Sequence, residues 1–195
     1  MNRRWLGILP AELGGPDMEI WDIYTIDGTP TGRTHVRGAE LAPGDYHLVV
    51  LVWVATPDGR FLVTKRHQDK AWPGLWECTG GSAVAGEGSL LAAVRELEEE
   101  TGLRADPALG RVVDSYVGDD SLYDVWLFVL DAGPSDIRLQ ERETVAARFL
   151  SPEAIRAMFS EGAMVPSLAR SFDAAVSGLG RSQSPAGIRM GDRQC

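Results

Sequence analysis

The chain has 195 residues, of which 44% are hydrophobic, so it is long enough to bury the core of one ordinary domain with modest extensions. Its formal charge of −9 argues against a general nucleic-acid-binding protein, because such proteins hold phosphate backbones with clustered lysines and arginines. The two cysteines, Cys78 and Cys195, form neither a disulfide framework nor a paired metal motif, which favours a reducing, cytoplasmic location.

The N-terminal segment contains two arginines and a short apolar run, which raises the question of a secretory signal. That run is too short for such a signal, and Pro10 interrupts it. No apolar run in the sequence approaches the roughly 18 residues that a membrane-spanning helix requires. We therefore expect residues 1–17 to form an N-terminal extension, residues 18–178 to form the domain and residues 179–195 to be a disordered tail, because that tail is glycine-rich and lacks periodicity.

The first half of the domain has the pattern of strands. Residues 18–27 alternate apolar and polar side chains and lead through a Gly-Thr-Pro turn to residues 34–37, which predicts an edge hairpin. Residues 46–55 form a nearly continuous apolar run rich in β-branched side chains, which indicates a strand covered on both faces. Asp58-Gly59 then turns the chain into residues 60–66, which predicts a second hairpin at the centre of the sheet.

Basic residues gather where this second hairpin ends. Lys65 and Arg66 lie at the strand exit, and His67 and Lys70 follow. Two interpretations stay open: an ordinary polar strand end, or a basic lip that receives a phosphate group. In the second interpretation Arg66 is the preferred substrate contact, with Lys65 beside it. The Trp-Pro-Gly-Leu-Trp stretch over residues 72–76 is interpreted as a packed loop that fixes the approach to the glycines that follow.

Residues 81–103 form a glycine-rich loop followed by a helix with an excess of carboxylates. With roughly 100° of rotation per residue, the side chains expected to face the core fall within a narrow arc and are Leu90, Val94, Leu97 and Thr101. Glu96, Glu99 and Glu100 crowd the far side of the helix, where neighbouring alanines leave room for a ligand. Ser89 is expected to cap the N-terminus of this helix.

Like-charged carboxylates three and four residues apart destabilise an isolated helix by about 0.2–0.5 kcal/mol per pair, so a compensating cation is expected here. Mg²⁺ takes oxygen ligands, and it binds one or two carboxylates while keeping waters and substrate phosphate oxygens in its shell. Arg95 lies four residues before Glu99 and next to Glu96, where it can orient these carboxylates or partly neutralise them. The alternative is a solvated acidic helix, which is what most charge runs are.

The combined spacing favours the metal site over the solvated helix. Gly81 is followed after five residues by Glu87, after seven more by Arg95-Glu96-Leu97, and then at intervals of one residue by Glu99-Glu100 and Gly102-Leu103. This pattern resembles the Nudix box, G-x5-E-x7-R-E-U-x-E-E-x-G-U, in which U is apolar, and every defining position matches. The resemblance implies an α/β/α sandwich of the α+β class with a mixed sheet. It also implies hydrolysis of a nucleoside diphosphate linked to another moiety, or of a related diphosphate, with Mg²⁺ or Mn²⁺.

Carried over by position, the resemblance implies that Glu99 and Glu100 are metal ligands, with the backbone carbonyl of Gly80 as a further ligand. Glu96 is either a metal ligand or the base that activates water. The implied catalytic residues are Glu96, Glu99 and Arg95. Metal ions at such a site neutralise the diphosphate and lower the pKa of a bound water.

Two further roles follow from the same resemblance. Arg95 and Glu87 are expected to brace the loop that begins at Gly81 against the helix. In Nudix hydrolases a glutamate from a loop late in the fold often joins the metal site or acts as base. Glu143 is the candidate here, and the alternative is a solvated loop residue. Independently of the resemblance, Asp124 follows an acidic turn and is a candidate for an extra metal or substrate contact, although turn aspartates usually serve the turn itself.

The remaining elements follow the helix. Residues 110–118 and 122–131 have the pattern of two strands around an acidic turn, and residues 145–150 that of another strand. Residues 151–161 open with Ser-Pro, which is typical of a helix with a proline at its first position. Residues 166–177 are expected to form a last helix with one apolar face.

Residues 18–130 also resemble isopentenyl-diphosphate isomerases, and the likeness places His35 and His47 near histidines that hold the isomerase metal. That isomerase needs a catalytic cysteine and a metal histidine in a C-G-H-P motif before the box glutamate, whereas this chain has Gly80-Gly81-Ser82-Ala83 there. Cys78 lies two residues too early to replace the cysteine. We therefore expect an isomerase-like Nudix hydrolase, and an isomerase is the alternative.

A non-catalytic Nudix-fold binding module is a third hypothesis. It would be favoured by a broken carboxylate set or an appended DNA-binding domain, and the sequence shows neither. The expected partner is a small-molecule diphosphate substrate, whose leaving group the box does not specify. We expect no general nucleic-acid or membrane binding, and dimerisation, which is common in the family, makes a homodimer a further expectation.

Overall fold

The computed structural model describes residues 19–180. Its strands are β1 (Ile20–Tyr24), β2 (Pro30–Val36), β3 (His47–Ala55), β4 (Phe61–Arg66), β5 (Trp76–Glu77), β6 (Thr79–Ser82), β7 (Arg111–Val117), β8 (Ser121–Val129) and β9 (Thr144–Leu150). Its α-helices are α1 (Ser89–Thr101), α2 (Pro152–Ser160) and α3 (Ala169–Leu179). Short 3-10 helices lie at Pro107–Leu109, Pro134–Asp136 and Pro166–Leu168.

The expected extension over residues 1–17 lies outside the described residues, as does the expected tail from residue 181 onward. Leu179, which was assigned to the tail, is instead the last residue of α3. The helix expected over residues 166–177 begins as a 3-10 turn and continues as α3. Across residues 19–180, no helix is both long and apolar enough to cross a bilayer.

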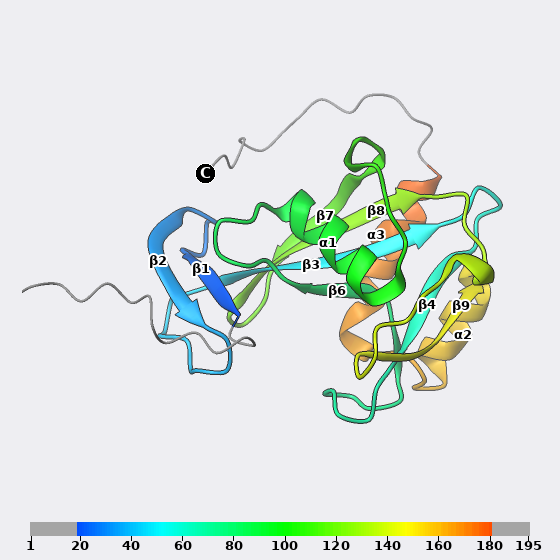
Figure 1. Cartoon of the computed structure of the whole chain (residues 1–195), viewed down its shortest axis with the longest axis horizontal. Coiled ribbons are helices and arrows are strands. Elements are labelled where there is room, and N and C mark those ends of the chain that lie inside the picture. The colour runs from blue at the N-terminus through cyan, green and yellow to red at the C-terminus, as the bar shows by residue number, and fades with distance from the viewer. Residues whose placement is uncertain (1–18, 181–195) are drawn as a thin grey trace, which may run out of the picture.

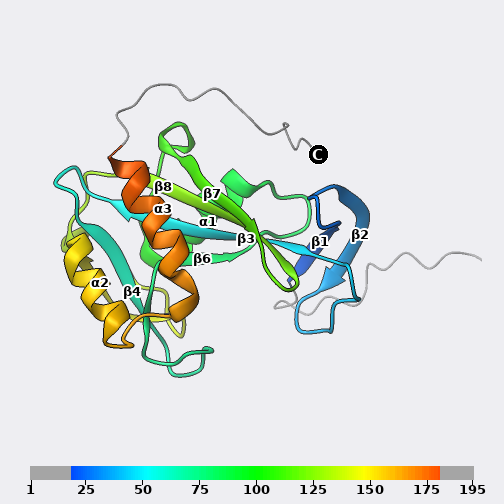
Figure 2. The ribbon, with the colours of Figure 1, turned by 180° about the vertical axis from the view of Figure 1, so that it is seen from behind.

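Strand β3 is covered on both faces, as its apolar run predicts. Its even-numbered apolar side chains lie on the face covered by α1 and are Leu48, Val50, Val52 and Val54. Trp53 and Ala55 point to the opposite face, where they pack with Phe172 of α3 and Ile155 of α2. Figures 1 and 2 show α1 on one side of the sheet and α2 and α3 on the other. This arrangement confirms the expected α/β/α sandwich.

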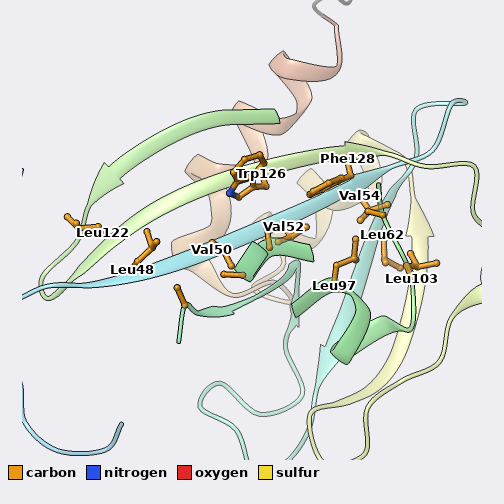
Figure 3. Close-up of a cluster of buried hydrophobic side chains, with 14 of the residues drawn as sticks. Leu48, Val50, Val52, Val54, Leu62, Leu97, Leu103, Leu122, Trp126 and Phe128 are labelled. Carbon is orange, nitrogen blue, oxygen red and sulfur yellow. The ribbon is translucent and has the colours of Figure 1, made fainter. Parts of the chain in front are cut away.

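The core on the α1 face is the one that positions the acidic helix. Figure 3 shows the side chains of Leu48, Val50, Val52 and Val54 on β3 with Trp126 and Phe128 of β8, and Leu97 projecting from α1. Leu97, Val50 and Phe128 are fully buried. Because this helix is fixed along its apolar side, the glutamates between its core residues are held in place against the sheet.

The sheet is mixed, with the order β5-β4-β3-β8-β7. Strands β3 and β8 run parallel over their whole length, from the pair His47–Ser121 to the pair Ala55–Val129. The expected central hairpin of β3 and β4 is a hairpin only at its turn, because these strands share one residue pair, Ala55–Phe61. Beyond that pair they diverge, since β6 pairs with β3 while β5 and β9 pair with β4. The chain over residues 76–82 therefore pairs first with β4, through β5, and then with β3, through β6.

The edge hairpin expected at the N-terminal end of the domain forms a separate two-stranded sheet, β1–β2. Tyr24 and Tyr46 join this hairpin to the start of β3 through two backbone hydrogen bonds of 2.8 and 3.0 Å. The amide of Ala85 donates to the Ile20 carbonyl at 2.7 Å, and that of Gly86 donates to Asp22 Oδ2 at 2.6 Å. The hairpin therefore holds the loop that precedes α1.

Candidate active site

Helix α1 begins and ends at glycines. Gly88 is its N-cap, in an extended conformation and without a side-chain cap. The expectation that Ser89 caps the helix is wrong: Ser89 is its first residue, and the Ser89 hydroxyl accepts a 2.8 Å hydrogen bond from the Trp126 indole. The Ser89 hydroxyl therefore accepts from Trp126 of β8 and does not accept from a backbone amide of the helix, as a cap would. Gly102, with φ of 73°, ends the helix, and its amide donates to the Glu98 carbonyl at 2.8 Å.

The acidic side of α1 partly faces the sheet, contrary to the expected separation of core and acidic sides. Glu100 is 3% exposed, and Ala92 and Ala93 are fully buried. The reason lies in β6, where a Cβ built on Gly81 would come within 2.2 Å of Glu96 Oε1. Because the strand carries no side chain there, the helix packs closely and the Glu96 carboxylate lies over the strand backbone.

Arg95 connects the loop, the strand and the helix. Its Nε and Nη2 each lie 2.9 Å from one carboxylate oxygen of Glu87, and Nη2 also donates to the Ser82 carbonyl at 3.0 Å. Its Nη1 lies 2.9 Å from Glu96 Oε1 and 3.0 Å from Glu99 Oε2. A planar guanidinium suits this geometry, because its donors match carboxylates in pairs. One arginine therefore orients three of the box glutamates.

Lys70 provides a second cation at the other end of the helix face. Its Nζ lies 3.3 Å from Glu100 Oε1, 2.5 Å from Glu143 Oε2 and 4.0 Å from Glu77 Oε1. Glu143 comes from the segment before β9, and its carbonyl accepts from the His67 amide at 3.0 Å. The fold thus brings the late-loop glutamate next to a box glutamate through a shared lysine.

Two of the other basic residues expected at this lip, Arg66 and Lys65, are engaged elsewhere. The Arg66 guanidinium contacts Glu77 and the carbonyl of Ala71, and the Arg66 side chain is only 16% exposed. The Lys65 ammonium lies over the Trp76 ring, 6.0 Å from its centroid. Arg66 therefore reaches a phosphate only if it leaves Glu77. Sequence reasoning missed Glu77, because a single glutamate between Trp76 and Cys78 gives no sign that the chain crosses between two strands there.

Burial dominates the electrostatics of these carboxylates. It raises the pKa of Glu100 to about 8; Lys70 opposes the rise, and the neighbouring Glu77 and Glu96 add to it. Burial likewise raises the pKa of Glu96, and Arg95 opposes that rise. The contact with Glu87 raises the pKa of the Arg95 guanidinium, which keeps Arg95 charged. These carboxylates are costly to ionise without a cation, which is the condition that favours metal binding.

The residues fit a divalent cation in chemistry, while their present arrangement is that of ion pairs. Among the described residues, no three His, Cys, Asp or Glu side chains are grouped as a metal site. Instead Arg95 and Lys70 occupy the carboxylates that the spacing assigns to a metal. Glu100 Oε2 is buried and has no hydrogen-bond partner, and such an unpaired oxygen is the kind of ligand that Mg²⁺ or Mn²⁺ takes.

The cysteine that could suggest isomerase chemistry lies away from α1. Cys78 is 3% exposed and packs in the core on the α2 and α3 side of the sheet. Burial raises the pKa of its thiol well above the ordinary value, so it is a structural thiol rather than a nucleophile. Asp124 accepts a 2.6 Å hydrogen bond from the Ser115 hydroxyl on the neighbouring strand.

The two histidines lie by the β1–β2 hairpin. His47 stacks on Trp21 with ring centroids 4.0 Å apart, and its Nε2 lies 2.9 Å from the Ser121 hydroxyl. His35 Nε2 lies 3.1 Å from the carbonyl of Ala39. Trp21 and His47 line a cavity of about 550 Å³ that the loop of residues 38–45 closes on one side.

Comparison with known proteins places this geometry in a family. The model of the NUDIX domain matches residues 45–171. This range includes the whole of α1 and the segments that carry Lys70 and Glu143. The chain belongs to the Nudix family. An uncharacterized Nudix hydrolase of Listeria monocytogenes is 40% identical over 151 residues, which cover 76% of this chain and 89% of that relative. The protein is a Nudix hydrolase, and the general reaction of this class is hydrolysis of a pyrophosphate bond.

Other similarities are shorter or more distant. An isopentenyl-diphosphate Delta-isomerase of Cutibacterium acnes is 46% identical over 70 residues, 34% of this chain and 35% of the isomerase. A crystal structure from Deinococcus radiodurans has a TM-score of 0.68 at 21% identity and covers 80% of this chain and 99% of that one. The NUDIX domain of Shewanella oneidensis NrtR, crystallised with ADP ribose, has a TM-score of 0.59 at 14% identity and covers 74% of this chain and 94% of that one. The two structures support the Nudix fold of this hydrolase.

Proposed function

We propose that this Nudix hydrolase cleaves the pyrophosphate bond of a nucleoside diphosphate derivative, or of a related small diphosphate, and that it uses Mg²⁺ or Mn²⁺. The observation that carries the proposal is the arrangement around Arg95. A single guanidinium joins Glu87, Glu96 and Glu99, while Glu96 lies over a strand position that has no side chain. That arrangement holds carboxylates of the box helix together beside the half-buried, side-chain-free backbone of Gly80 and Gly81, where an anionic substrate and a cation can meet.

The metal would be held by Glu99 and Glu100, with the Gly80 carbonyl as a further ligand, and Glu96 would be either a third ligand or the base that activates water. When bound, the ion would neutralise charge on the diphosphate and make a water molecule a stronger nucleophile. Of these two roles we propose the base for Glu96, because its carboxylate lies over the side-chain-free strand position at Gly81, next to the proposed ligands Glu99 and Glu100. The attacking oxygen bonds to phosphorus, the anhydride P–O bond breaks, and the proton passes to the Glu96 carboxylate.

The chain's own residues also place the substrate. Lys65, Arg66 and Glu143 remain the proposed substrate contacts, and of these Arg66 must first give up its contact with Glu77. Arg95 and Glu87 act by positioning, because their paired hydrogen bonds fix the loop against the helix. The isomerase alternative loses support, because Cys78 is buried on the other side of the sheet from the box helix.

The test is a panel of diphosphates assayed for released phosphate products with Mg²⁺, with Mn²⁺ and with a chelator. The panel contains nucleoside triphosphates, nucleotide sugars, dinucleotides and a prenyl diphosphate, and the prenyl diphosphate is also assayed for isomerisation. Hydrolysis of a panel member that the chelator abolishes supports the proposal. Isomerisation without hydrolysis contradicts it, as does hydrolysis that is insensitive to the chelator.

Paired substitutions on α1 assign the site. Glu100→Gln removes a proposed ligand, and we expect turnover to fall by more than about a hundredfold, the upper range for losing a group that only supports a ligand. The control is Glu98→Gln, which removes the same charge from the same helix at a residue that pairs with exposed Arg104. Equal turnover of the two variants would remove Glu100 from the site.

A cytoplasmic location and a homodimer are also our proposals. The reduced, buried Cys78 supports the first, because such thiols persist in reducing compartments. Strand β7 lies at the edge of the sheet and carries the exposed side chains of Val112 and Val117. We propose that the backbone of this strand pairs with a second copy of the chain, and that the two valines pack at the interface. Sedimentation of the purified protein tests the dimer.

A further inference from the structure

A single ammonium group lies among three glutamates in the wall of the proposed site. Lys70 belongs to the loop of residues 67–75, which joins β4 to β5, and its side chain is 20% exposed. Its partners Glu77 and Glu100 are more deeply buried, with side chains 9% and 4% exposed. Glu143, the nearest partner at 2.5 Å, is 39% exposed and marks the outer end of the cluster. The ammonium thus lies between an interior carboxylate and a surface carboxylate.

The cations of this cluster are unevenly distributed between Glu77 and Glu100. The Arg66 guanidinium forms an ion pair with Glu77. Within residues 19–180, Lys70 is the only cation in ion-pair contact with Glu100. The second oxygen of Glu100, Oε2, is buried without a hydrogen-bond partner. Glu100 therefore has one oxygen compensated by a tethered cation and one oxygen left open. A buried carboxylate with one unpaired oxygen is incompletely compensated, and a divalent cation would compensate its charge more fully than one ammonium does.

We propose that Lys70 is the resident counter-ion of Glu100 and is exchanged for the divalent metal, so that metal binding releases the ammonium and opens the loop of residues 67–75. This inference rests on the proposed metal site and adds a residue outside the Nudix box that sets its affinity. In the metal-free enzyme, Lys70 holds the loop closed over the C-terminal part of α1. In the metal-bound enzyme, the ammonium stays with Glu143 near the surface.

The two cations compete if the metal takes Oε1 of Glu100. Mg²⁺ lies about 2.0–2.1 Å from its oxygen ligands, so an ion on Oε1 would meet an ammonium that is 3.3 Å from the same oxygen. Like charges at such a separation repel strongly where little water screens them. The flexible four-carbon stem of lysine allows the ammonium to move, and Glu143 offers it a partner toward solvent. A metal that takes Oε1, or both oxygens of Glu100, therefore displaces Lys70.

The base of the loop is held by backbone hydrogen bonds, whereas its tip is exposed and is held by side-chain contacts. At the base, the amide of Arg66 donates to the Leu75 carbonyl at 2.9 Å, and that of Gly74 donates to the Arg66 carbonyl at 3.2 Å. At the tip, Trp72 is 57% exposed and has a φ of 55°, which is uncommon for a residue other than glycine. Figure 1 shows this loop projecting from the ends of its two strands. Lys70 joins the tip to Glu100. The Arg66 guanidinium contacts both the carbonyl of Ala71 and Glu77, so it is a second link between the tip and the interior.

The experiment measures metal binding directly, without substrate. Mn²⁺ is titrated into the full-length protein and the free ion is followed by electron paramagnetic resonance. Lys70→Met keeps the length of the side chain without its charge, and Lys70→Gln guards against a folding defect of the first variant. Arg104→Met is the matched control, because it removes a cation that pairs with Glu98 on the exposed side of the same helix.

We expect both Lys70 variants to bind Mn²⁺ at least about tenfold more tightly than the wild type, since a tenfold change corresponds to about 1.4 kcal/mol of removed competition. Arg104→Met should bind as the wild type does. Hydrogen exchange supplies an independent readout: Mn²⁺ should speed amide exchange over residues 67–75 in the wild type and leave it unchanged in Lys70→Met.

Two results overturn the inference alone: equal or weaker Mn²⁺ binding by both Lys70 variants, or slower exchange of this loop when the wild type binds Mn²⁺. Mn²⁺ binding by the wild type in either case leaves the proposed function standing. A protein that binds no Mn²⁺ in any of the four forms contradicts both the inference and the proposed metal site.

Discussion

At the scale of single residues, adjacent glycines in β6 serve different purposes. A Cβ on Gly80 would lie 2.4 Å from the carbonyl oxygen of Val50, which is backbone and cannot move away. A Cβ on Gly81 would meet only the end of the Glu96 side chain, at 2.2 Å from Oε1. The first glycine therefore allows two strands to pair, and the second allows a carboxylate to lie where the site needs it.

Alanine substitutions separate these purposes. Gly80→Ala should lower the free energy of unfolding by about 1–3 kcal/mol, the usual cost of overpacking. Gly81→Ala should keep most of that stability but lower turnover by about a hundredfold, because a displaced catalytic group can cost that much. Gly88→Ala is the control, since a Cβ there meets nothing within 4 Å. Urea unfolding and steady-state kinetics measure the two effects, and a fully active Gly81→Ala protein would contradict the role of Glu96.

At the scale of elements, the loop of residues 83–88 and helix α1 are joined by a paired contact. Both oxygens of Glu87 accept from Arg95 at 2.9 Å, and Glu87 Oε2 also accepts from the Val84 amide at 3.1 Å. The side chains of Arg95 and Glu87 are 25% and 12% exposed, so water screens the pair only in part. The loop and the helix therefore behave as one unit.

A double-mutant cycle measures this link. Arg95→Lys keeps the charge but loses the paired donors, and Glu87→Gln keeps the shape but loses the charge. We expect a coupling energy of about 0.5–3 kcal/mol from the unfolding free energies of the two single variants and the double variant. The exposed pair of Arg104 and Glu98, changed in the same way, should show little coupling. Additive effects at Arg95 and Glu87 would mean that the contact does not link the two elements.

The β1–β2 hairpin gives a second element-scale prediction, which concerns pH. Burial lowers the pKa of His47 below its ordinary value of 6.5, with Asp120 opposing the change. The unfolded chain therefore takes up a proton at this position at a higher pH than the folded chain does. The stability that comes from the neutral His47 is present above pH 6.5 and is lost as the pH falls below it.

We expect the wild type to lose more unfolding free energy between pH 7.5 and pH 5.5 than His47→Gln does. Thermal unfolding at a series of pH values measures the difference. His67→Gln is the control, because it removes a histidine of the loop of residues 67–75, and His67 is not among the groups that shift the pKa of His47. A His47→Gln protein with the same pH dependence as the wild type would show that this stacked ring does not titrate with unfolding.

At the scale of the whole molecule, the sheet separates two cores with different tasks. The core under α1 positions the site, whereas the core under α2 and α3 only stabilises the sheet from behind. Phe172 is central to the second core, with its ring centroid 5.0 Å from that of Trp53 and 5.6 Å from that of Phe61. Stability and catalysis should therefore respond to different substitutions.

Phe172→Ala tests that separation. We expect a loss of about 3–5 kcal/mol of unfolding free energy, as for other large aromatic truncations in cores, while the KM measured at low temperature stays near that of the wild type. Leu91→Ala is the control for stability, because Leu91 is 60% exposed on the outer side of α1. A large change of KM in Phe172→Ala would show that the two cores are not independent.

The sequence alone determined the local features of this protein. The apolar run of β3, the turn at Gly59 and the spacing from Gly81 to Leu103 each depend on neighbouring residues. They sufficed for these strands and for the Nudix box, and the resemblance to that family implied the sandwich. Periodicity, turn chemistry and fixed spacing are properties of short stretches, so they can be read without a structure.

Only the tertiary structure decided how the charges are shared. Lys70, Glu77 and Glu143 come from three separate segments, and no spacing within any one of them indicates that they meet Glu100. The burial of Glu100 and the loss of the Ser89 cap have the same origin, since both depend on what the sheet presents to α1. The physical reason is that the free energy of a charge depends on its whole surroundings, which are assembled only when distant parts of the chain pack together.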